Sequence, residues 1–421
     1  MKVVSSSVGI FTALGTGNGP GILTDANYNV NTLNKTFTAG EAVVLWGTGL
    51  GAVANDTTSP PGGNLPTKVE VFVGGVSVPT AYSGRGPGLA GTDQIVFTIP
   101  TSAPTGCWVP VMVRTEGVYV SNSVTISIGT GSNCSDPINP LQKGFVQGGN
   151  IGIISNVRYA MHEDIGVLST VDVVSDQVFQ RFSSETGGPF AFQPFISIPP
   201  PGTCTAYNFA GDLFVDYPNP VTYAPTGRYL DAGSSVTVTG SAGSVTSTQA
   251  SGSPIIWGFL GGSATGYNVS PPPLLNSGLL SLSTSGGADI GPIQGNIAAP
   301  TPITWTNRDQ VSPITRSQGF TVNWNGGASY QYFGIFGVSE DIPTNSSSAF
   351  LCTIATGTSS FNVPGLVLQN MAPSRSDLSQ TKALVYLIAV PQIGSPNLSG
   401  TGVTAAAAGA FYATGTTVVF Q

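Results

Sequence analysis

Short runs in which apolar and polar residues alternate, separated by Gly-rich turns, fill the chain from Gly40 to Ile128. A period of two is typical of strands with one buried face, and the spacing leaves no room for helices between the runs. We therefore expect an all-β fold of tandem β-sandwich domains, the first of them immunoglobulin-like. Its expected strands lie at 41–51, 69–80, 93–100, 109–120 and 121–128.

Three turns are predicted from residues that accept positive φ angles. Gly74 and Gly75 separate alternating Val residues, which indicates a two-residue hairpin, and a second reversal is expected at Glu116 and Gly117. Farther along, Asn325 and Gly326 predict a tight hairpin within 321–338.

The pattern changes near residues 134–145. Beyond it, Pro-rich and Ser/Thr-rich segments at 199–207, 229–248 and 271–275 indicate antiparallel strands joined by polar loops, and the last thirteen residues predict two short strands. The expected organisation is an N-terminal strand or extension at 1–23, the Ig-like sandwich at 24–134, and a second β-sandwich region at 135–421. A further division is expected near 300, between Ala299 and Thr301.

Four segments of the first third resemble the IPT/TIG-type Ig repeats of large secreted or surface proteins of acidobacteria: GEAVVLWGTGLG, VFVGGVSVP, AYSGRGPGLAGTDQIVFTIP and VYVSNSVTISI. In that family the repeat often opens with a Pro-Gly-Ile-Phe-Thr run that trails an upstream domain. Here Val8 stands in place of the Pro, before Gly9 to Thr12. The later PITWTNRDQ and RSQGFTVNWNGG resemble an uncharacterised C-terminal β module that accompanies such repeats. The resemblance implies an architecture and carries over no catalytic residues.

Composition favours an exported protein. Only 8% of the residues are charged, against about 25% in an ordinary soluble domain, so Ser, Thr, Asn and Gly must form much of the surface. The net charge of −7 argues against nucleic acid or anionic membranes as partners. No apolar run approaches the roughly 18 to 20 residues that span a bilayer, so we expect no membrane insertion. The first residues also lack the apolar stretch of a secretory signal, so the numbering is expected to start at a mature or truncated N-terminus.

The four cysteines add to the argument for export. Cys107 and Cys134 flank the last strands of the first sandwich, where we expect a disulfide that stabilises the fold by about 3 to 4 kcal/mol; two buried thiols are the alternative. Cys204 and Cys352 form a possible second pair, although four cysteines allow three pairings.

Signals for catalysis are weak. The single histidine, His162, stands beside Glu163 and Asp164 and is expected to be a solvated turn residue, and no G-x-S-x-G motif occurs. The cysteines lack the spacing of a zinc site. Adjacent carboxylates, such as Glu340 and Asp341, point apart in a strand and do not form the facing pair of a glycosidase.

Two further motifs imitate ligand-binding sequences. Gly47, Gly49 and Ala52 fit a dinucleotide fingerprint, but a polar loop follows in place of a helix, so a strand-to-loop turn is expected. Oxygen-bearing side chains alternate from Asp25 to Asn31, yet the Gly and Glu of an EF-hand are missing; an Asx-rich turn is favoured over another kind of calcium loop. We therefore expect no cofactor and no metal.

Aromatic residues offer a lead for binding. Tyr330, Tyr332, Phe333 and Phe336 lie close together, and flat aromatic faces bind sugar rings in some sandwiches. Core packing is the favoured alternative, with Tyr330 and Tyr332 on one face of a strand and Phe333 on the other.

The N-terminal segment 1–12 has strand character through its apolar residues Val3, Val4, Val8, Ile10 and Phe11. A lone apolar strand either docks on its own domain or adds to the sheet of a neighbouring molecule, and both outcomes remain open. The sequence thus predicts a secreted or surface-exposed, non-enzymatic structural or adhesive protein, self-assembling into a filament or surface layer by strand donation. Its expected partners are copies of itself, other surface proteins or glycans. The alternatives are a carbohydrate-binding module and a polysaccharide hydrolase.

Overall fold

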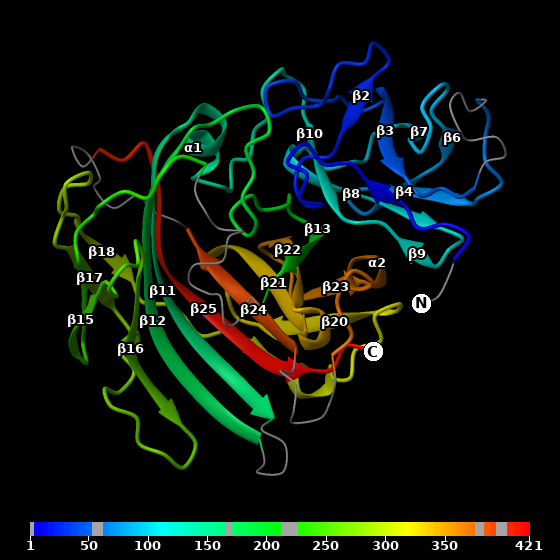
Figure 1. Cartoon of the computed structure of the whole chain (residues 1–421). Helices are drawn as coiled ribbons and strands as arrows, with labels where there is room; N and C mark the ends of the chain where they lie inside the picture. Colours follow the sequence, from blue (N-terminus) through cyan, green and yellow to red (C-terminus); the bar gives the residue numbers. More distant parts are fainter. Residues whose placement is uncertain (1–3, 53–61, 165–169, 212–225, 375–382, 393–401) are drawn as a thin grey trace.

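The computed structural model describes residues 4–421 apart from 53–61, 165–169, 212–225, 375–382 and 393–401 (Figure 1). The described chain is all-β, as predicted, and its sheets are almost entirely antiparallel. Two short helices, α1 (Gln142–Gln147) and α2 (Gly365–Leu368), lie among the strands.

The first third forms a sandwich of two sheets. One has the order β1 (Gly9–Ile10), β3 (Ala42–Thr48), β7 (Asp93–Thr98) and β6 (Thr80–Arg85), with β2 (Leu23–Asp25) also paired to β3. The other has the order β10 (Val124–Ile128), β8 (Gly106–Thr115), β4 (Val69–Val73) and β5 (Val76–Val78), with β9 (Tyr119–Val120) beside β8. Alternate residues such as Val43, Leu45, Val71, Val111 and Ile95 fill the space between the sheets.

Both turns predicted in this sandwich are present. Gly74 and Gly75 have φ angles of 56° and 84° between β4 and β5, and Glu116 and Gly117 have 54° and 70° between β8 and β9. A Cβ atom on Gly74 would lie 2.5 Å from a ring carbon of Pro104, so glycine is required there for space as well as for conformation.

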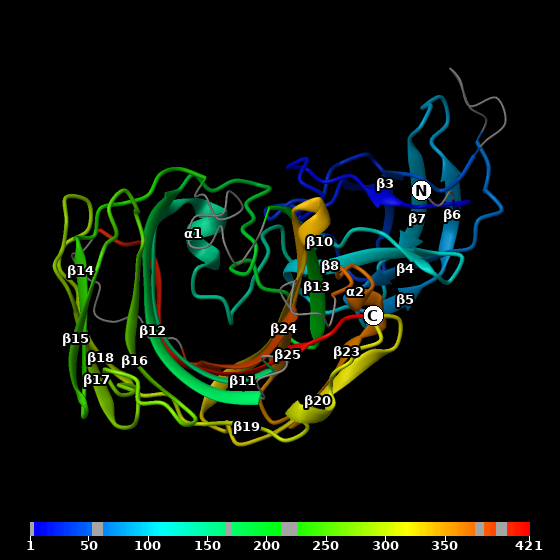
Figure 2. The ribbon, with the colours of Figure 1, turned by 60° about the horizontal axis from the view of Figure 1, so that its bottom comes forward.

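A single eight-stranded sheet dominates the rest of the chain. Its order is β13 (Thr203–Ala210), β22 (Ser346–Ala355), β21 (Tyr330–Asp341), β24 (Ala383–Pro391), β25 (Ala405–Val418), β11 (Gly149–Asp164), β12 (Thr170–Glu185) and β16 (Ile256–Ala264). Only β11 and β25 run parallel to each other. The end of the chain is therefore one strand of 14 residues, where the sequence suggested two short ones. The sheet curls strongly into a trough (Figures 1 and 2).

Two small sheets cover the convex face of this sheet (Figure 2). The four-stranded sheet β15 (Gly243–Thr248), β14 (Ser235–Gly240), β17 (Leu279–Thr284) and β18 (Gln294–Ala298) packs on β11, β12 and β25 through Val236, Val238 and Leu280. The three-stranded sheet β19 (Thr304–Trp305), β20 (Gly319–Asn325) and β23 (Ser360–Pro364) packs on β21, β22 and β24 through Trp324 and Val363. Near residue 300, where the sequence suggested a further division, the chain passes from the four-stranded to the three-stranded covering sheet. The eight-stranded sheet contains strands from before and after this point, so both parts of the chain share it.

The hairpin predicted at Asn325 and Gly326 is wrong. β20 ends at Asn325 and pairs with β19 and β23, whereas β21 begins at Tyr330 and pairs with β22 and β24. The connection crosses between two packed sheets. Gly326 and Gly327 both have φ of 89°, and a Cβ on Gly327 would lie 2.4 Å from the Phe333 ring, so the glycines serve this crossing rather than a primed turn.

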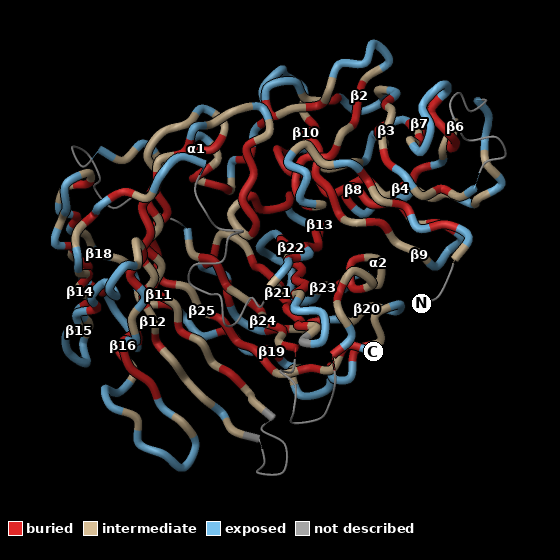
Figure 3. The backbone as a smooth tube through the Cα atoms, in the orientation of Figure 1, coloured by how far each residue is buried: buried red, intermediate tan, exposed pale blue. Residues whose placement is uncertain are grey.

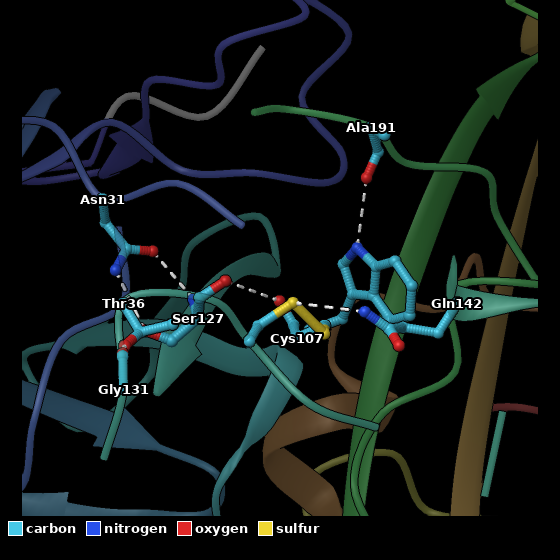
Figure 4. The surroundings of a disulfide bond; sticks show 9 residues. Asn31, Thr36, Cys107, Ser127, Gly131, Gln142 and Ala191 are labelled. Atoms are coloured by element: carbon cyan, nitrogen blue, oxygen red, sulfur yellow. Dashed lines mark hydrogen bonds between the residues drawn. A yellow bond between two sulfur atoms is a disulfide. The ribbon is translucent and has the colours of Figure 1, made fainter. Parts of the chain in front are cut away.

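The first sandwich is attached to the second region around Trp108, the neighbour of Cys107, and Figure 4 shows the surroundings of that cysteine. The buried indole donates a hydrogen bond to the carbonyl of Ala191, 3.2 Å away. The neighbouring Cys107 is joined to Cys134, and Ser127 donates to the carbonyl of Cys107 while exchanging two hydrogen bonds with Asn31. Leu33 and Trp108 of the sandwich share a core with Phe145 and Tyr207 of the second region.

Candidate functional site

The concave face of the eight-stranded sheet is the most distinctive surface of the described chain. Along β11 the odd-numbered residues face the trough, whereas Ile154 on the other face packs under the four-stranded sheet. In Figure 3 β11 and β12 accordingly alternate between buried and half-buried positions. The floor is built by residues from six adjacent strands: Ser155, Val157, Tyr159, Gln177, Phe179, Tyr332, Phe336, Leu351, Tyr386, Ile388, Phe411 and Ala413.

One end of the trough is filled by the chain itself. Leu141 and Phe145, at the start of α1 and within it, pack together with Phe192 and the partly buried Phe195. This cluster lies on Ile151 and its neighbours at the beginning of β11. The segments at 139–141 and 195–198 therefore form a wall at this end of the open part of the trough.

The open part holds two adjoining cavities with volumes of about 380 and 570 Å³. They share Val157, Tyr159, Phe179, Leu351 and Ile388 in their lining, so they are two parts of one space. Each volume falls within the range of about 300 to 1,000 Å³ that is usual for ligand pockets. Large apolar side chains of the floor such as Val157, Phe179 and Leu351 are only half-buried, while those on the opposite face are fully buried in two cores.

Tyrosine and phenylalanine rings form a continuous aromatic patch in the floor. The ring of Tyr386 lies edge-on to Tyr159 at 5.9 Å between centroids and stacks near Phe336 at 6.3 Å. Phe336 in turn contacts Phe195 edge-on at 5.2 Å. Burial raises the pKa of Tyr159 to about 12 and also raises the pKa of Tyr386. Both phenols are therefore neutral at physiological pH.

The positive charge of Arg181 at the trough is balanced within the chain. The guanidinium of Arg181 donates to Oε1 of Gln193 at 3.2 Å, lies 3.8 Å from a carboxylate oxygen of Glu185, and stands over the ring of Tyr229. Glu185 also accepts hydrogen bonds from Ser183 and Thr226. The arginine thus links β12 to the segments that contain Gln193 and Tyr229.

Asp136 lies buried near the same wall. Desolvation raises the pKa of this carboxyl to about 7, although a hydrogen bond from the backbone N–H of Ile138 acts in the opposite direction. Its negative charge also raises the pKa of Tyr332, whose pKa is raised mainly by burial.

Edge strand β16 forms an aromatic rim. The Trp257 side chain, 45% exposed, lines the trough and donates from Nε1 to Oε1 of Gln177 at 2.8 Å. Phe259, two residues farther on and 44% exposed, follows on the same strand. The apolar surface therefore continues from the floor to the edge of the sheet.

Of the four aromatic residues singled out from the sequence, two line the trough and two lie in a core. Tyr332 and Phe336 line the cavities, whereas Tyr330 and Phe333 belong to the core under the three-stranded sheet. The prediction that Tyr330 and Tyr332 share a face is wrong, because a bulge between them shifts the register with β24. The other trough residues were not singled out from the sequence. The available signal was the long alternation of 149–164 and 170–185, which combines apolar with small polar residues on one face.

The N-terminal strand lies on its own domain. Val8 and Ile10 are buried in the first core, β1 pairs with β3, and Val4 is half-buried while Phe11 is 39% exposed. Val3 lies outside the described residues. The structure thus shows the docked arrangement of this segment, and donation to another molecule stays a prediction.

Replacing Ile10 by Ala should therefore destabilise the folded monomer by about 2 to 4 kcal/mol, since a core methyl-bearing side chain is lost. The same change at Phe11 should cost less than about 1 kcal/mol, because that ring is partly in water. Denaturant unfolding of both variants measures the difference. Equal small losses, together with a change in particle size by light scattering, would instead favour donation of this strand to another molecule.

Other candidate residues from the sequence make hydrogen bonds or ion pairs within the fold. His162 Nδ1 lies 2.9 Å from an oxygen of Asp172 and alternates with Met161 and Glu163, which line the trough, so it faces away from the cavities. Asp25 caps its own turn by accepting hydrogen bonds from the N–H groups of Asn27 and Asn29. Within the described residues, no group of three or more His, Cys, Asp or Glu side chains is placed to hold a metal.

The remaining motifs are accounted for by the strands. Gly47 lies in β3, where a Cβ would be 2.5 Å from the carbonyl oxygen of Gly9, so close strand pairing explains this glycine. Glu340 and Asp341 end β21 side by side in sequence. The side chain of Asp164 lies outside the described part of the structure, while Glu163 lines the trough.

Both cysteine pairs considered from the sequence are joined by disulfides. Cys107–Cys134 has Cα atoms 5.0 Å apart at the end of the first sandwich. Cys204–Cys352 links directly opposed residues of β13 and β22 in the eight-stranded sheet. The structure leaves no cysteine free, since all four residues of this type are paired.

No described helix is long and apolar enough to cross a membrane. No protein-family model matches the chain, and no curated protein matches it. Among solved structures it is similar to the I67–I69 fragment of titin, with 5% identity over 93% of this chain and 96% of that chain, at a TM-score of 0.14.

A second similarity is to the Escherichia coli adhesin FdeC, with 9% identity over 95% of this chain and 96% of that chain, at a TM-score of 0.17. The I9–I11 tandem of titin matches with 7% identity over 95% and 100% of the two chains, at a TM-score of 0.13. At these TM-scores the matches carry no argument about function, and the case for a site rests on the geometry of the trough.

Proposed function

We propose that this chain is an extracellular, non-enzymatic binding protein of adhesive or structural type, and that the trough is its binding site. One observation carries the proposal. The convex face of the eight-stranded sheet is covered by two sheets, whereas its concave face keeps half-buried Val157, Tyr159 and Ile388 around a cavity. Apolar surface that the described part of the chain leaves around a cavity is a common mark of a binding site.

The frame around the trough suits this role outside the cell. Two disulfides, one at the junction of the sandwich and one within the sheet, are typical of oxidising compartments. The first sandwich is anchored through the hydrogen bond of Trp108 and a shared core, so it supports the sheet beside β13. A scaffold of this kind keeps the geometry of a binding surface fixed, and binding of this type requires no catalytic groups.

Glycan binding is the second candidate, favoured by the aromatic patch of Tyr159, Phe336 and Tyr386. Against it, the lining beside these rings is aliphatic, with Val157, Ile388 and Leu351 where the two cavities meet. Sugar hydroxyls placed on such a floor would lose hydrogen bonds to water without replacement. Hydrolysis has less support, because glycoside hydrolysis requires a facing pair of carboxyl groups, and Glu163 is the single described Asp or Glu that lines the two cavities.

The proposal is tested with the uncharged apolar dye Nile red. Wild-type protein should enhance its fluorescence in a saturable way, and Val157→Arg should abolish this by placing a charge in the floor. Val118→Arg, at a turn residue that is 60% exposed, is the control and should bind like wild type. A wild-type protein that does not bind the dye, or a Val157→Arg variant that is folded and binds it normally, would contradict the proposal.

A further inference from the structure

We infer that the trough takes a long, uncharged aliphatic chain, of the kind found in neutral acyl lipids. This inference rests on the proposed function of the trough and names its ligand class. Three properties of the lining carry it: the chemistry of the floor, the balance of charge, and the elongated shape of the space.

Aliphatic side chains are the largest group in the lining of the two cavities, around the aromatic patch in the floor. Where β11, β24 and β22 face the cavities, Val157, Ile388 and Leu351 lie at the place where the two cavities meet. Strand β25 adds the small side chains of Ala407 and Ala413. The side-chain amide of Gln177 already accepts from Trp257. A chain of methylene groups gains about 0.8 kcal/mol for each group buried in such a site and requires no hydrogen-bonding partners.

The electrostatics favour an uncharged ligand. Arg181 already contacts Gln193 and Glu185, so its positive charge is balanced within the wall. The phenol of Tyr159 is neutral, because burial raises its pKa to about 12. At the other end the trough is lined by Glu163, which would repel an anionic head group. An uncharged head avoids the cost of desolvating an unpaired charge here.

The space is elongated along the strands. One cavity reaches Ile153 and the other reaches Met161, and both residues lie on the same face of β11. Eight residue steps of an antiparallel strand correspond to roughly 27 Å at about 3.4 Å per residue. A compact ligand would leave much of this length empty, whereas an extended chain follows it. The rim residues Trp257 and Phe259 add apolar surface beside the path.

The test is displacement of Nile red by three unlabelled compounds, each used below its aggregation limit. Hexadecan-1-ol should displace the dye, hexadecanoate should bind at least about tenfold more weakly, and the neutral oligosaccharide cellohexaose should leave the signal unchanged. Dye binding should be lost with Ser155→Trp, which fills the floor without adding charge, whereas dye binding and displacement should be normal with the control Val118→Arg. Far-UV circular dichroism and melting curves establish that each variant is folded.

The outcomes separate the inference from the proposed function. If the dye binds in wild type and is lost in the trough variants, but the alcohol fails to displace it, the ligand class is overturned while the binding site stands. Displacement by cellohexaose, or tighter binding of hexadecanoate than of the alcohol, also overturns the inference. If the dye does not bind at all, the proposed function fails together with it.

Discussion

Replacing Asp176 by Ala is expected to destabilise the protein by about 3 to 5 kcal/mol, the loss found when one partner of a buried ion pair is removed. The carboxylate is fully buried and accepts from Nε and Nη2 of Arg158 at 2.7 and 2.6 Å. It also accepts from the backbone N–H of Leu275 at 2.7 Å, and Arg158 donates to Asn276. The pair thus joins β11 and β12 to the chain that enters the four-stranded covering sheet.

Chemical denaturation measures this loss, with two controls. Lys35→Ala breaks an exposed pair with Asp25, in which the nitrogen and oxygen are 3.8 Å apart, and should cost less than about 1 kcal/mol. The double variant Arg158→Met, Asp176→Leu removes both charges and should recover much of the loss, because no unpaired guanidinium remains. If Asp176→Ala were as mild as Lys35→Ala, the pair would not hold the covering sheet.

The second large effect is a dependence of stability on pH from Asp136. Its pKa is raised to about 7 in the folded protein by burial, whereas an unfolded Asp titrates near 3.9. The folded state therefore binds more protons between these values, and stability must fall as the pH rises from about 4 to 7. A pKa shift of this size changes the free energy of unfolding by at most about 4 kcal/mol across this pH range.

Asp136→Asn should remove this dependence. At pH 8 the variant should be more stable than wild type, and near pH 3 the two should be similar, because wild-type Asp136 is then largely protonated in both states. Asp309→Asn, at a side chain that is 59% exposed, serves as the control and should keep the wild-type profile. Urea unfolding across this range gives the comparison. Parallel curves for wild type and Asp136→Asn would show that the carboxyl is not buried as described.

Local patterns in the sequence were enough to find individual strands and tight turns. Gly74 and Gly75 lie between short strands that pair with each other, so the information for that hairpin is contained in a few adjacent residues. The same reasoning failed at Asn325 and Gly326, because partners for β20 and β21 come from other parts of the chain. Turn chemistry shows that the chain can reverse; it does not show which sheet each strand joins.

The trough could not be predicted because its construction is non-local. Ile151 pairs with Ala405 of a parallel strand far along the sequence, and no short motif indicates that pairing. The alternation of Ser155, Val157 and Tyr159 predicts a half-buried strand, and the pattern is the same whether the second face meets solvent or an apolar cavity. The bulge after Tyr330 was likewise not predictable from the alternation of residues. One extra residue there changes the face of the sheet on which each aromatic side chain lies.

The central claim, that the trough is an accessible apolar binding site, is tested most directly by photolabelling with a small uncharged aryl diazirine. Such a reagent enters apolar cavities whatever the natural ligand is, and peptide mapping then locates the adducts. The account predicts labelling concentrated on peptides that contain Val157 and Tyr159 of β11 and Ile388 of β24, and its loss in the Val157→Arg variant. Labelling confined to exposed residues such as Leu279 and Val118, with the trough peptides unmodified, would contradict it.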